Sequence, residues 1–278
     1  MDIPPLGNGQ TTSGPGNQLR DVGDRPNALK HALENSQIQL GLWCALGCAL
    51  CTELVAGGGA DWLLIDCEHG PNDLRSAVGQ LQAVGRYPVE PIVRLPSDER
   101  TLIKQFLDAG ARSLMIPNVN SAEQAKAIVA GTRYPPEGVR GFSSRHRANQ
   151  FGRAANYRRT AKEQQLLAVQ IETPEAVRNA PSIARVEGVD VLFVGPGDLA
   201  VHTGSSGHPD AEELQAAFRQ VLSAAAESRK VAGIWAPDPP FARRCIARGF
   251  RMVAIGSDTG VLVKGVEALL AGMRTEAP

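Results

Sequence analysis

Three polar side chains follow one short apolar run and are the first candidates for chemistry in this chain. The run is Trp62–Ile65, and Asp66, Glu68 and His69 come directly after it. A run without polar residues is typical of a strand buried on both faces of a parallel sheet. Ligands bind at the carboxyl ends of such strands, and the ordinary pKa of histidine lies near neutrality. We therefore predict that His69 is a catalytic base, with a purely structural histidine as the alternative.

Two further carboxylates close later apolar runs. Glu172 follows Leu166–Ile171, and Asp198 follows Val189–Gly195. Two carboxylates held close together repel each other unless a cation lies between them, and they suit a hard octahedral ion such as Mg²⁺ or Mn²⁺. Each carboxylate could equally well cap the helix that follows it. The pattern alone does not separate a metal site from two helix caps.

Arg94 lies in the apolar run Pro91–Leu95, where a surface arginine would be unusual. A guanidinium at a strand end can bind a carboxylate or stabilise an oxyanion, and it can also pair with a carboxylate of the site itself. Asp108, late in the next helical stretch, is a candidate to orient the imidazole of His69. The alternative for Asp108 is a solvated position on the helix surface.

The turn Gly195–Leu199 leads from an apolar run toward a helix. Backbone N–H groups at such a turn can hold a substrate carboxylate while Asp198 binds a metal ion. Glycines also occur at any sharp connection between a strand and a helix. The turn is therefore a weak signal when it is taken alone.

All these candidates need a framework that brings strand ends together. Eight apolar runs alternate with stretches of helical spacing, which predicts eight parallel strands and a (β/α)₈ TIM barrel as a single domain. In such a barrel the strand ends meet at one mouth. The structural rival is a doubly wound open sheet, which normally carries a glycine-rich loop after its first strand, and Gly47 is alone there. The runs are Ile38–Leu46, Trp62–Ile65, Pro91–Leu95, Ser113–Pro117, Leu166–Ile171, Val189–Gly195, Val231–Trp235 and Met252–Gly256.

The ends and the bulk composition narrow the class of protein. Residues 1–25 are rich in Gly, Pro, Asn and Thr, which predicts a flexible tail before a barrel domain at 26–278, with a short helix at Pro26–Asn35. Formal net charge is +0 with a pI near 7.0, which argues against nucleic acid or an anionic membrane as a partner. No apolar run spans a bilayer, and the N-terminus lacks a signal-peptide core. A cytoplasmic location is expected.

The cysteines permit a redox interpretation. An odd count of 5 without a regular framework fits a reducing compartment. Cys44, Cys48 and Cys51 follow the first predicted strand with the C-x-x-x-C-x-x-C spacing by which radical-SAM enzymes hold an iron–sulfur cluster. The surrounding stretch is apolar, however, so the same cysteines can simply pack in a core.

A basic segment runs from Arg140 to Arg159 and contains Arg145, Arg147 and Arg153 among others. It can be a mobile flap that attracts an anionic second substrate. A solvated surface loop or a contact between subunits explains the same composition.

Taken in order, these motifs resemble the metal-dependent (class II) pyruvate aldolases of the 4-hydroxy-2-oxoheptanedioate aldolase type. The similarity runs from about Gln39 to the C-terminus. The cysteines and the N-terminal tail are not part of the family pattern. The matching motifs are Gly41-Leu42-Trp43, Asp61-Trp62-Leu63-Leu64-Ile65-Asp66-x-Glu68-His69-Gly70-Pro71-Asn72, Val93-Arg94, Arg133-Tyr134-Pro135-Pro136-x-Gly138-x-Arg140-Gly141, Gln170-Ile171-Glu172-Thr173 and Val194-Gly195-Pro196-x-Asp198-Leu199.

The resemblance implies a homo-oligomeric barrel, a hexamer or trimer of dimers, with its sites near subunit contacts. It implies a divalent ion (Mg²⁺ or Mn²⁺, with Co²⁺ as a further choice) held by Glu172 and Asp198. Pyruvate would chelate this ion through its keto and carboxylate oxygens. Gln170 and the backbone around Gly197 would hold the substrate with Asp198.

The same resemblance implies that His69 is the base, made more basic by Asp108, and that Arg94 stabilises developing negative charge. The reaction would cleave or form 4-hydroxy-2-oxo acids, giving pyruvate and an aldehyde through a metal-bound pyruvate enolate. No Schiff-base lysine is needed, and none is found at a strand end. The alternatives are a related enolate-forming lyase or decarboxylase acting on an acyl-CoA ester or oxaloacetate, and a radical-SAM enzyme that uses the three clustered cysteines.

Overall fold

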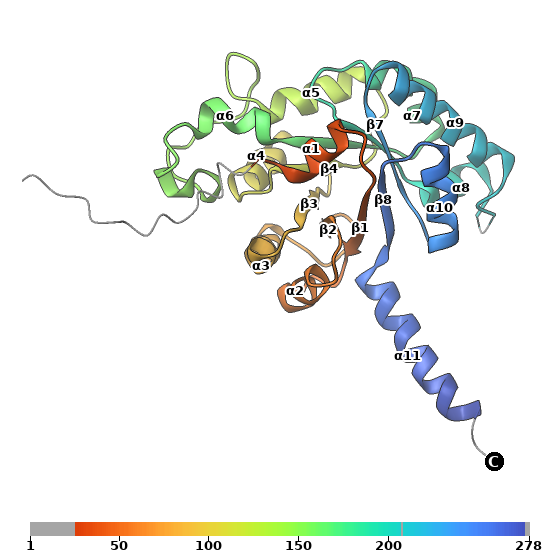
Figure 1. Cartoon of the computed structure of the whole chain (residues 1–278). Helices are drawn as coiled ribbons and strands as arrows, with labels where there is room; N and C mark the ends of the chain where they lie inside the picture. Colours follow the sequence, from red (N-terminus) through yellow and green to blue (C-terminus); the bar gives the residue numbers. More distant parts are fainter. Residues whose placement is uncertain (1–25, 207, 276–278) are drawn as a thin grey trace, which may run out of the picture.

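The computed structural model describes residues 26–206 and 208–275, so the predicted tail at 1–25 lies outside the described residues. Eight parallel strands pair in chain order and β8 pairs with β1, which closes the barrel (Figure 1). The (β/α)₈ barrel is thus confirmed, and each predicted apolar run overlaps one strand. The strands are β1 Gln39–Cys44, β2 Trp62–Asp66, β3 Glu90–Arg94, β4 Ser113–Ile116, β5 Leu166–Ile171, β6 Val191–Val194, β7 Val231–Trp235 and β8 Met252–Ser257.

Helices cover the outside of the barrel, and polar caps set where several of them begin. Asp73, Ser121, Thr173 and Asp238 each accept a backbone N–H from the first turn of the helix that follows. The helices are α1 Ala28–Glu34, α2 Ala49–Ala56, α3 Leu74–Ala83, α4 Arg100–Asp108, α5 Ala122–Thr132, α6 Tyr157–Gln164, α7 Pro174–Ala184, α8 Pro196–Thr203, α9 Glu212–Glu227, α10 Pro239–Arg248 and α11 Asp258–Thr275, with 3-10 turns at Val84–Arg86 and Arg147–Gly152.

Aromatic side chains fill the inside of the barrel. The rings of Trp43, Trp62 and Phe193 pack against one another at centroid distances of 5.6 to 6.2 Å. Gly41 is needed beside them, because a Cβ atom there would collide with the indole of Trp62. The interior is therefore a packed core, and the space for chemistry is left at its ends.

Helix α1 packs on this interior core through Leu29 and Leu33. The side chain of Asn27 caps the helix by accepting the N–H of Lys30. The expected helix at Pro26–Asn35 is confirmed, although Pro26 precedes the cap instead of lying in the first turn. The amino-terminal segment thus packs against the barrel interior.

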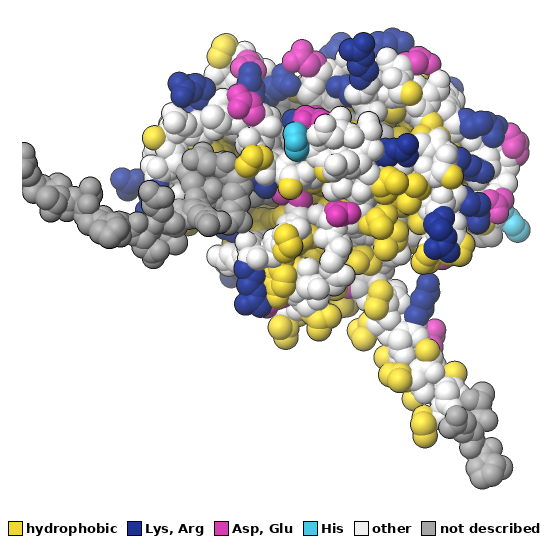
Figure 2. All heavy atoms as spheres, viewed as in Figure 1, with side chains coloured by type: hydrophobic (Ala, Val, Ile, Leu, Met, Phe, Trp, Pro, Cys, Tyr) yellow, Lys and Arg dark blue, Asp and Glu magenta, His cyan; other side chains and the backbone are white. Residues whose placement is uncertain are grey.

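Helix α11 stands away from the barrel instead of packing against it (Figure 1). Its large apolar side chains are 48–75% exposed from Val261 to Met273, and they are visible along the helix in Figure 2. An exposed apolar surface of this kind is typical of a contact with another protein surface. Within the described ranges, no helix combines the length and the apolarity that crossing a membrane requires.

Candidate active site

Arg94 is the centre of a polar cluster at the carboxyl-terminal rim of the barrel. The parallel register of β2 and β3 places it beside Asp66. Its Nε and Nη2 atoms donate to the two carboxylate oxygens of Asp66 at 2.9 and 2.7 Å. Burial opposes ionisation of Asp66, but the hydrogen bonds and charge of Arg94 outweigh it and keep the pKa of Asp66 below its ordinary value. This bidentate pair fixes the plane of the guanidinium.

The remaining nitrogen of Arg94 points toward other groups of the mouth. Nη1 lies 2.9 Å from Glu68 Oε2 and donates to Gln170 Oε1 at 3.4 Å. The ring of Trp43 lies 5.4 Å from the guanidinium carbon and covers it from the core side. The structure thus gives Arg94 the ion pairs that the sequence left open as an alternative, and it places Nη1 between Glu68 and Gln170.

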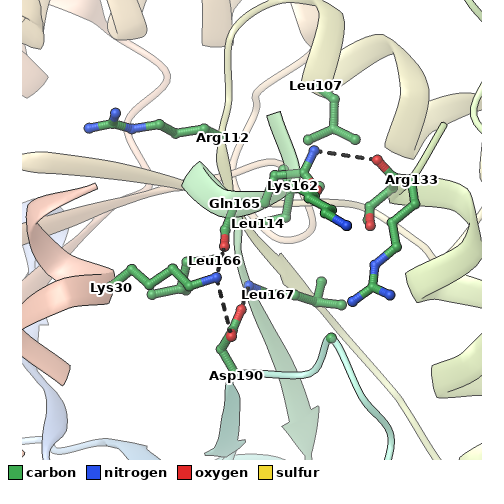
Figure 3. Close-up of a pocket in the computed structure, with 12 residues that line it drawn as sticks. Lys30, Leu107, Arg112, Leu114, Arg133, Lys162, Gln165, Leu166, Leu167 and Asp190 are labelled. Carbon is green, nitrogen blue, oxygen red and sulfur yellow. Dashed lines mark hydrogen bonds and ion pairs between the residues drawn. The ribbon is translucent and has the colours of Figure 1, made fainter. Parts of the chain in front are cut away.

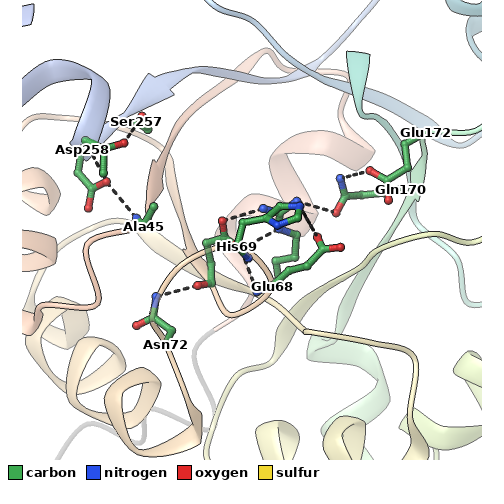
Figure 4. Close-up of polar contacts among 11 residues, drawn as sticks. Ala45, Glu68, His69, Asn72, Gln170, Glu172, Ser257 and Asp258 are labelled. Carbon is green, nitrogen blue, oxygen red and sulfur yellow. Dashed lines mark hydrogen bonds and ion pairs between the residues drawn. The ribbon is translucent and has the colours of Figure 1, made fainter. Parts of the chain in front are cut away.

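Glu172 is a buried carboxylate beside this cluster. Its Oε1 accepts the backbone N–H of Asn118 at 2.7 Å, and its Oε2 accepts Nε2 of Gln170 at 2.8 Å (Figure 4). Asn118 reaches this position with a left-handed φ of 54°. Burial raises the pKa of Glu172 to about 7, and the charges of Asp198 and Glu68 add to the shift. Such a group favours either a proton or a cation.

Asp198 reaches the same mouth from the first turn of α8. Gly195 comes before that turn, and a Cβ atom there would lie 2.6 Å from Glu172 Oε2, so only glycine fits without displacing the carboxylate. Gly197 faces open space, with no atom within 4 Å of a Cβ built on it. The buried Glu172, the exposed Asp198 and the free space beside them suit a hard divalent ion. Among the described residues, however, no three His, Cys, Asp or Glu side chains lie together as a ready-made metal site.

His69 lies on the loop after β2, and Asp66 shapes that loop. The backbone N–H groups of Glu68 and His69 both donate to Asp66 Oδ1, at 3.0 and 3.2 Å. The imidazole is 68% exposed, and its Nε2 lies 3.9 Å from Glu68 Oε2. Burial raises the pKa of Glu68, while the charges of Arg94 and His69 oppose that shift. The imidazole is thus accessible and is linked to Arg94 through Glu68.

Asp108 is the one predicted site residue that the structure does not bring to the mouth. It is the last residue of α4, which returns from the rim toward the start of β4. Its Oδ1 lies 2.6 Å from Arg140 Nη2 and 3.8 Å from His146 Nε2. No contact described in this chain joins Asp108 to His69.

The basic segment is only partly a solvated loop. Arg140 is 1% exposed, and its guanidinium carbon lies 4.6 Å from the ring of Tyr134 and 5.8 Å from that of Tyr157. A 3-10 turn and α6 follow within the same segment. Arg140 therefore ties this segment to the end of α4 through Asp108.

Asp66 and Asn118 are the residues of the site whose roles the sequence did not reveal. A usable signal for Asp66 was present, because an Asp that accepts N–H groups two and three residues later is a common turn former. For Asn118 the contribution is its backbone N–H, which no side-chain pattern can show. Both residues position the groups that were predicted.

A pocket lies at the opposite end of the barrel from the Arg94 cluster (Figure 3). It is lined by cations that already have partners. Lys30 Nζ lies 2.7 Å from the carbonyl oxygen of Gln165 and 3.6 Å from Asp190, and Lys162 pairs with Glu137 at 2.7 Å. Both lysines line this pocket beside the start of β5, whereas Glu172 follows the end of β5.

Comparison with known proteins gives one consistent result. The family model described as HpcH/HpaI aldolase/citrate lyase matches residues 39–265. A pyruvate aldolase of Rhizobium etli is 46% identical over 249 residues, which are 90% of this chain and 98% of that protein. A 4-hydroxy-2-oxo-heptane-1,7-dioate aldolase of Escherichia coli is 42% identical over 252 residues, covering 90% of this chain and 96% of that protein.

The solved structures agree with the sequence matches. An HpcH/HpaI aldolase/citrate lyase family protein from Burkholderia cenocepacia superimposes with a TM-score of 0.87 at 38% identity, covering 89% of this chain and 99% of that one. These matches support an aldolase more strongly than another enolate-forming lyase or a radical-SAM enzyme.

Proposed function

The chain belongs to the HpcH/HpaI aldolase/citrate lyase family of metal-dependent carbon–carbon lyases, and we propose that its reaction is the reversible cleavage of 4-hydroxy-2-oxo acids to pyruvate and an aldehyde. One observation supports this most strongly. The buried Glu172 lies within the electrostatic influence of Asp198 and Arg94 at a single rim of the barrel. A cation site beside a fixed guanidinium suits a 2-oxo acid, which carries one carboxylate and a polarisable carbonyl.

The metal ligands in this proposal are Glu172 and Asp198. Gln170 and Asn118 hold the Glu172 carboxylate from the protein side, and each of its oxygens has a further lone pair. A bound Mg²⁺ or Mn²⁺ would act as a Lewis acid on the substrate carbonyl. The choice between these ions and Co²⁺ is part of the proposal and is tested by metal replacement.

The substrate carboxylate is assigned to the start of α8, where a Cβ atom on Gly197 would meet open space and the N–H groups of the first helical turn can bind an anion. Arg94 Nη1 then meets the carbonyl oxygen of the 2-oxo acid, where negative charge grows as the carbon–carbon bond breaks. Its pairing with Asp66 holds the guanidinium in place before the substrate arrives. Gln170 contacts both Arg94 and Glu172 and so fixes the position of the guanidinium relative to the carboxylate.

His69 is assigned as the base that removes the proton of the substrate's 4-hydroxyl group. Its exposed imidazole can take that proton, directly or through water, as the C3–C4 bond breaks to release the aldehyde. In the reverse direction it returns the proton to the new hydroxyl group. Glu68 Oε2 lies 3.9 Å from the Nε2 atom of this imidazole.

The deciding experiment is a coupled assay of pyruvate release over a panel of 4-hydroxy-2-oxo acids. We expect activity that a chelator removes and that Mg²⁺ or Mn²⁺ restores. We expect His69→Ala to lower kcat for aldol cleavage by about 10² to 10⁴-fold, which is the usual contribution of a general base. An exposed histidine elsewhere, His202→Ala, provides the matched control. Full cleavage by His69→Ala would refute the base assignment, and release of no pyruvate under any metal would refute the reaction.

Asp108 keeps a role in this proposal only through a second copy of the chain. Within one chain it pairs with Arg140, so a neighbouring copy must bring its Asp108 to His69. The exposed apolar face of α11 supports assembly into a homo-oligomer. Mixed assemblies of His69→Ala and Asp108→Asn chains test this, because some sites would regain both residues. Activity above that of either variant supports a shared site, and no recovery in a mixed assembly confirmed by mass refutes it.

The cellular setting is also a proposal. All 5 cysteines are free, and three of them (Cys44, Cys67 and Cys245) are buried. Free thiols in this number support a reducing compartment, for which the cytoplasm is the default. The substrates in this proposal are a 2-oxo acid and an aldehyde. Fractionation of cells that express the full chain tests the location.

A further inference from the structure

Two of the five cysteines differ from the others in access. Cys44, Cys67 and Cys245 are buried, and burial raises the pKa of each thiol, to about 12 for the first two and about 11 for the third. Such thiols are poor nucleophiles. Cys48 and Cys51 are half-buried and lie beside the mouth of the barrel, at the start of α2. Neither residue has a task in the aldolase site.

These two cysteines form a C-x-x-C pair at the first turn of a helix. Cys48 is the N-cap of α2, and Cys51 lies in its first turn. The backbone N–H and the thiol of Cys51, followed by the backbone N–H of Leu50, lower the pKa of Cys48, and the same contact raises the pKa of Cys51. The structure therefore places two half-buried free thiols three residues apart at the start of one helix, which is the arrangement of dithiol redox pairs.

A chain of hydrogen bonds joins this turn to Asp66, which begins the loop that carries His69. Thr52, next to Cys51, donates its hydroxyl to Gln80 Oε1 at 2.8 Å. Gln80 Nε2 donates to Asn72 Oδ1 at 2.6 Å, and Asn72 Nδ2 donates to the carbonyl oxygen of Asp66 at 2.7 Å. Asp66 in turn holds Arg94 and the backbone of the His69 loop. A conformational change in the first turn of α2 can therefore reach Asp66 through a continuous chain of hydrogen bonds.

A second contact runs along the loop between β1 and α2. Asp258 accepts the backbone N–H groups of Ala45 and Leu46 at 3.0 and 3.1 Å (Figure 4). Gly47 follows with a left-handed φ of 67° and packs on Pro71, whose carbonyl oxygen would lie 3.2 Å from a Cβ atom there. The loop before Cys48 is therefore anchored on one side and pressed against the His69 loop on the other.

We propose that Cys48 and Cys51 are a redox-active dithiol. A peroxide oxidises the two thiols to one disulfide, and formation of this disulfide loosens the loop that carries His69. The Cys48 thiolate attacks one peroxide oxygen, the O–O bond breaks, and Cys48 sulfenic acid forms as hydroxide leaves. The sulfur of Cys51 then attacks the sulfur of Cys48, the S–O bond breaks, and the thiol proton leaves with hydroxide as water. Two thiols are oxidised by two electrons, and the peroxide is reduced to two molecules of water.

The test uses the full chain in its native assembly, treated with hydrogen peroxide and analysed by mass spectrometry. We expect each chain to lose two hydrogen atoms, peptide mapping to link Cys48 to Cys51, and a reducing dithiol to reverse the change. The three buried cysteines serve as internal controls and should remain thiols. Hydrogen exchange at the amides of Glu68 and His69 should become faster in the oxidised protein, by at least about twofold.

Two variants test the order of events. Cys51→Ser should stop at the sulfenic acid of Cys48, which dimedone traps, whereas Cys48→Ser should give no adduct at Cys51. Unchanged thiols after peroxide treatment, a crosslink between chains, or a disulfide to a buried cysteine would overturn the dithiol. A Cys48–Cys51 disulfide that leaves amide exchange in the His69 loop unchanged would overturn its coupling to the mouth. Neither readout depends on aldolase activity.

Discussion

Replacing the buried acid Glu172 with glutamine should stabilise the metal-free protein while it abolishes metal binding. The pKa of Glu172 is raised from 4.5 to about 7, chiefly by burial. The folded chain therefore binds a proton that the unfolded chain releases between these two values. The stabilising contribution is fully present below pH 4.5 and is lost as the pH rises to about 7. Above that value the wild-type chain must bury a charge, and Glu172→Gln does not.

The size of the effect follows from that shift. A change from 4.5 to about 7 corresponds to about 3 kcal/mol in the free energy of unfolding. The new amide must meet Gln170 Nε2, which now donates to Glu172, so the Gln170 amide has to turn and lose its contact with Arg94. That rearrangement costs about 1 kcal/mol. The variant should therefore gain about 2 kcal/mol at pH 8, or about 4 to 8 °C in Tm.

The assay is thermal unfolding of chelator-treated protein from pH 5 to pH 8. We expect the Tm difference between Glu172→Gln and wild type to grow with pH and to nearly vanish at pH 5. Added Mn²⁺ should raise the Tm of wild type alone. Glu175→Gln, an exposed carboxylate three residues later, is the matched control and should show no such pH dependence. A variant less stable than wild type at pH 8, or a difference independent of pH, would refute the electrostatic reasoning.

Two further substitutions test the supports of the site. Asp66→Asn removes the bidentate carboxylate partner of the buried Arg94 and leaves only Glu68 at Nη1, so we expect a loss of about 3 kcal/mol in denaturant unfolding and at least about a hundredfold loss in kcat/KM. A stable variant with normal kcat/KM would show that Asp66 does not position the guanidinium. Gly195→Ala places a Cβ atom 2.6 Å from Glu172 Oε2 and should weaken Mn²⁺ binding about tenfold or more, measured by titration calorimetry with circular dichroism as the folding control. Unchanged Mn²⁺ affinity would exclude Glu172 as a ligand.

The barrel was predictable because its strands are buried on both faces. All four residues of Trp62–Ile65 are 0% exposed, so the apolar run coincides with the part of β2 inside the core. The positions of Glu172, Asp198, Arg94 and His69 at one rim follow from the same topology. A residue that ends a parallel strand lies at that rim whatever its partners are.

The partners themselves were not predictable from residue types. Arg94 pairs with Asp66 because the register of β2 and β3 sets those two residues side by side, and register is a property of the assembled sheet. For Asp108 the sequence did not reveal that the residue pairs with Arg140 within its own chain. It lies at the end of a helix of 9 residues, which carries it about 13 Å back from the rim, although its distance in sequence from Arg94 fits the family pattern. The exposure of α11 also had no signal in the sequence, because its apolar pattern would equally fit a helix packed on its own barrel.

The charges at the mouth imply an order of binding. The single positive charge of Arg94 is shared by Asp66 and Glu68, and among the described residues Glu172 and Asp198 have no ion pair. An anionic 2-oxo acid would meet repulsion there, and partial protonation of Glu172 lessens this only below about pH 7. A divalent ion reverses the sign of that interaction. The ion should therefore bind first, and pyruvate should bind to metal-free protein far more weakly than to the metal-loaded form.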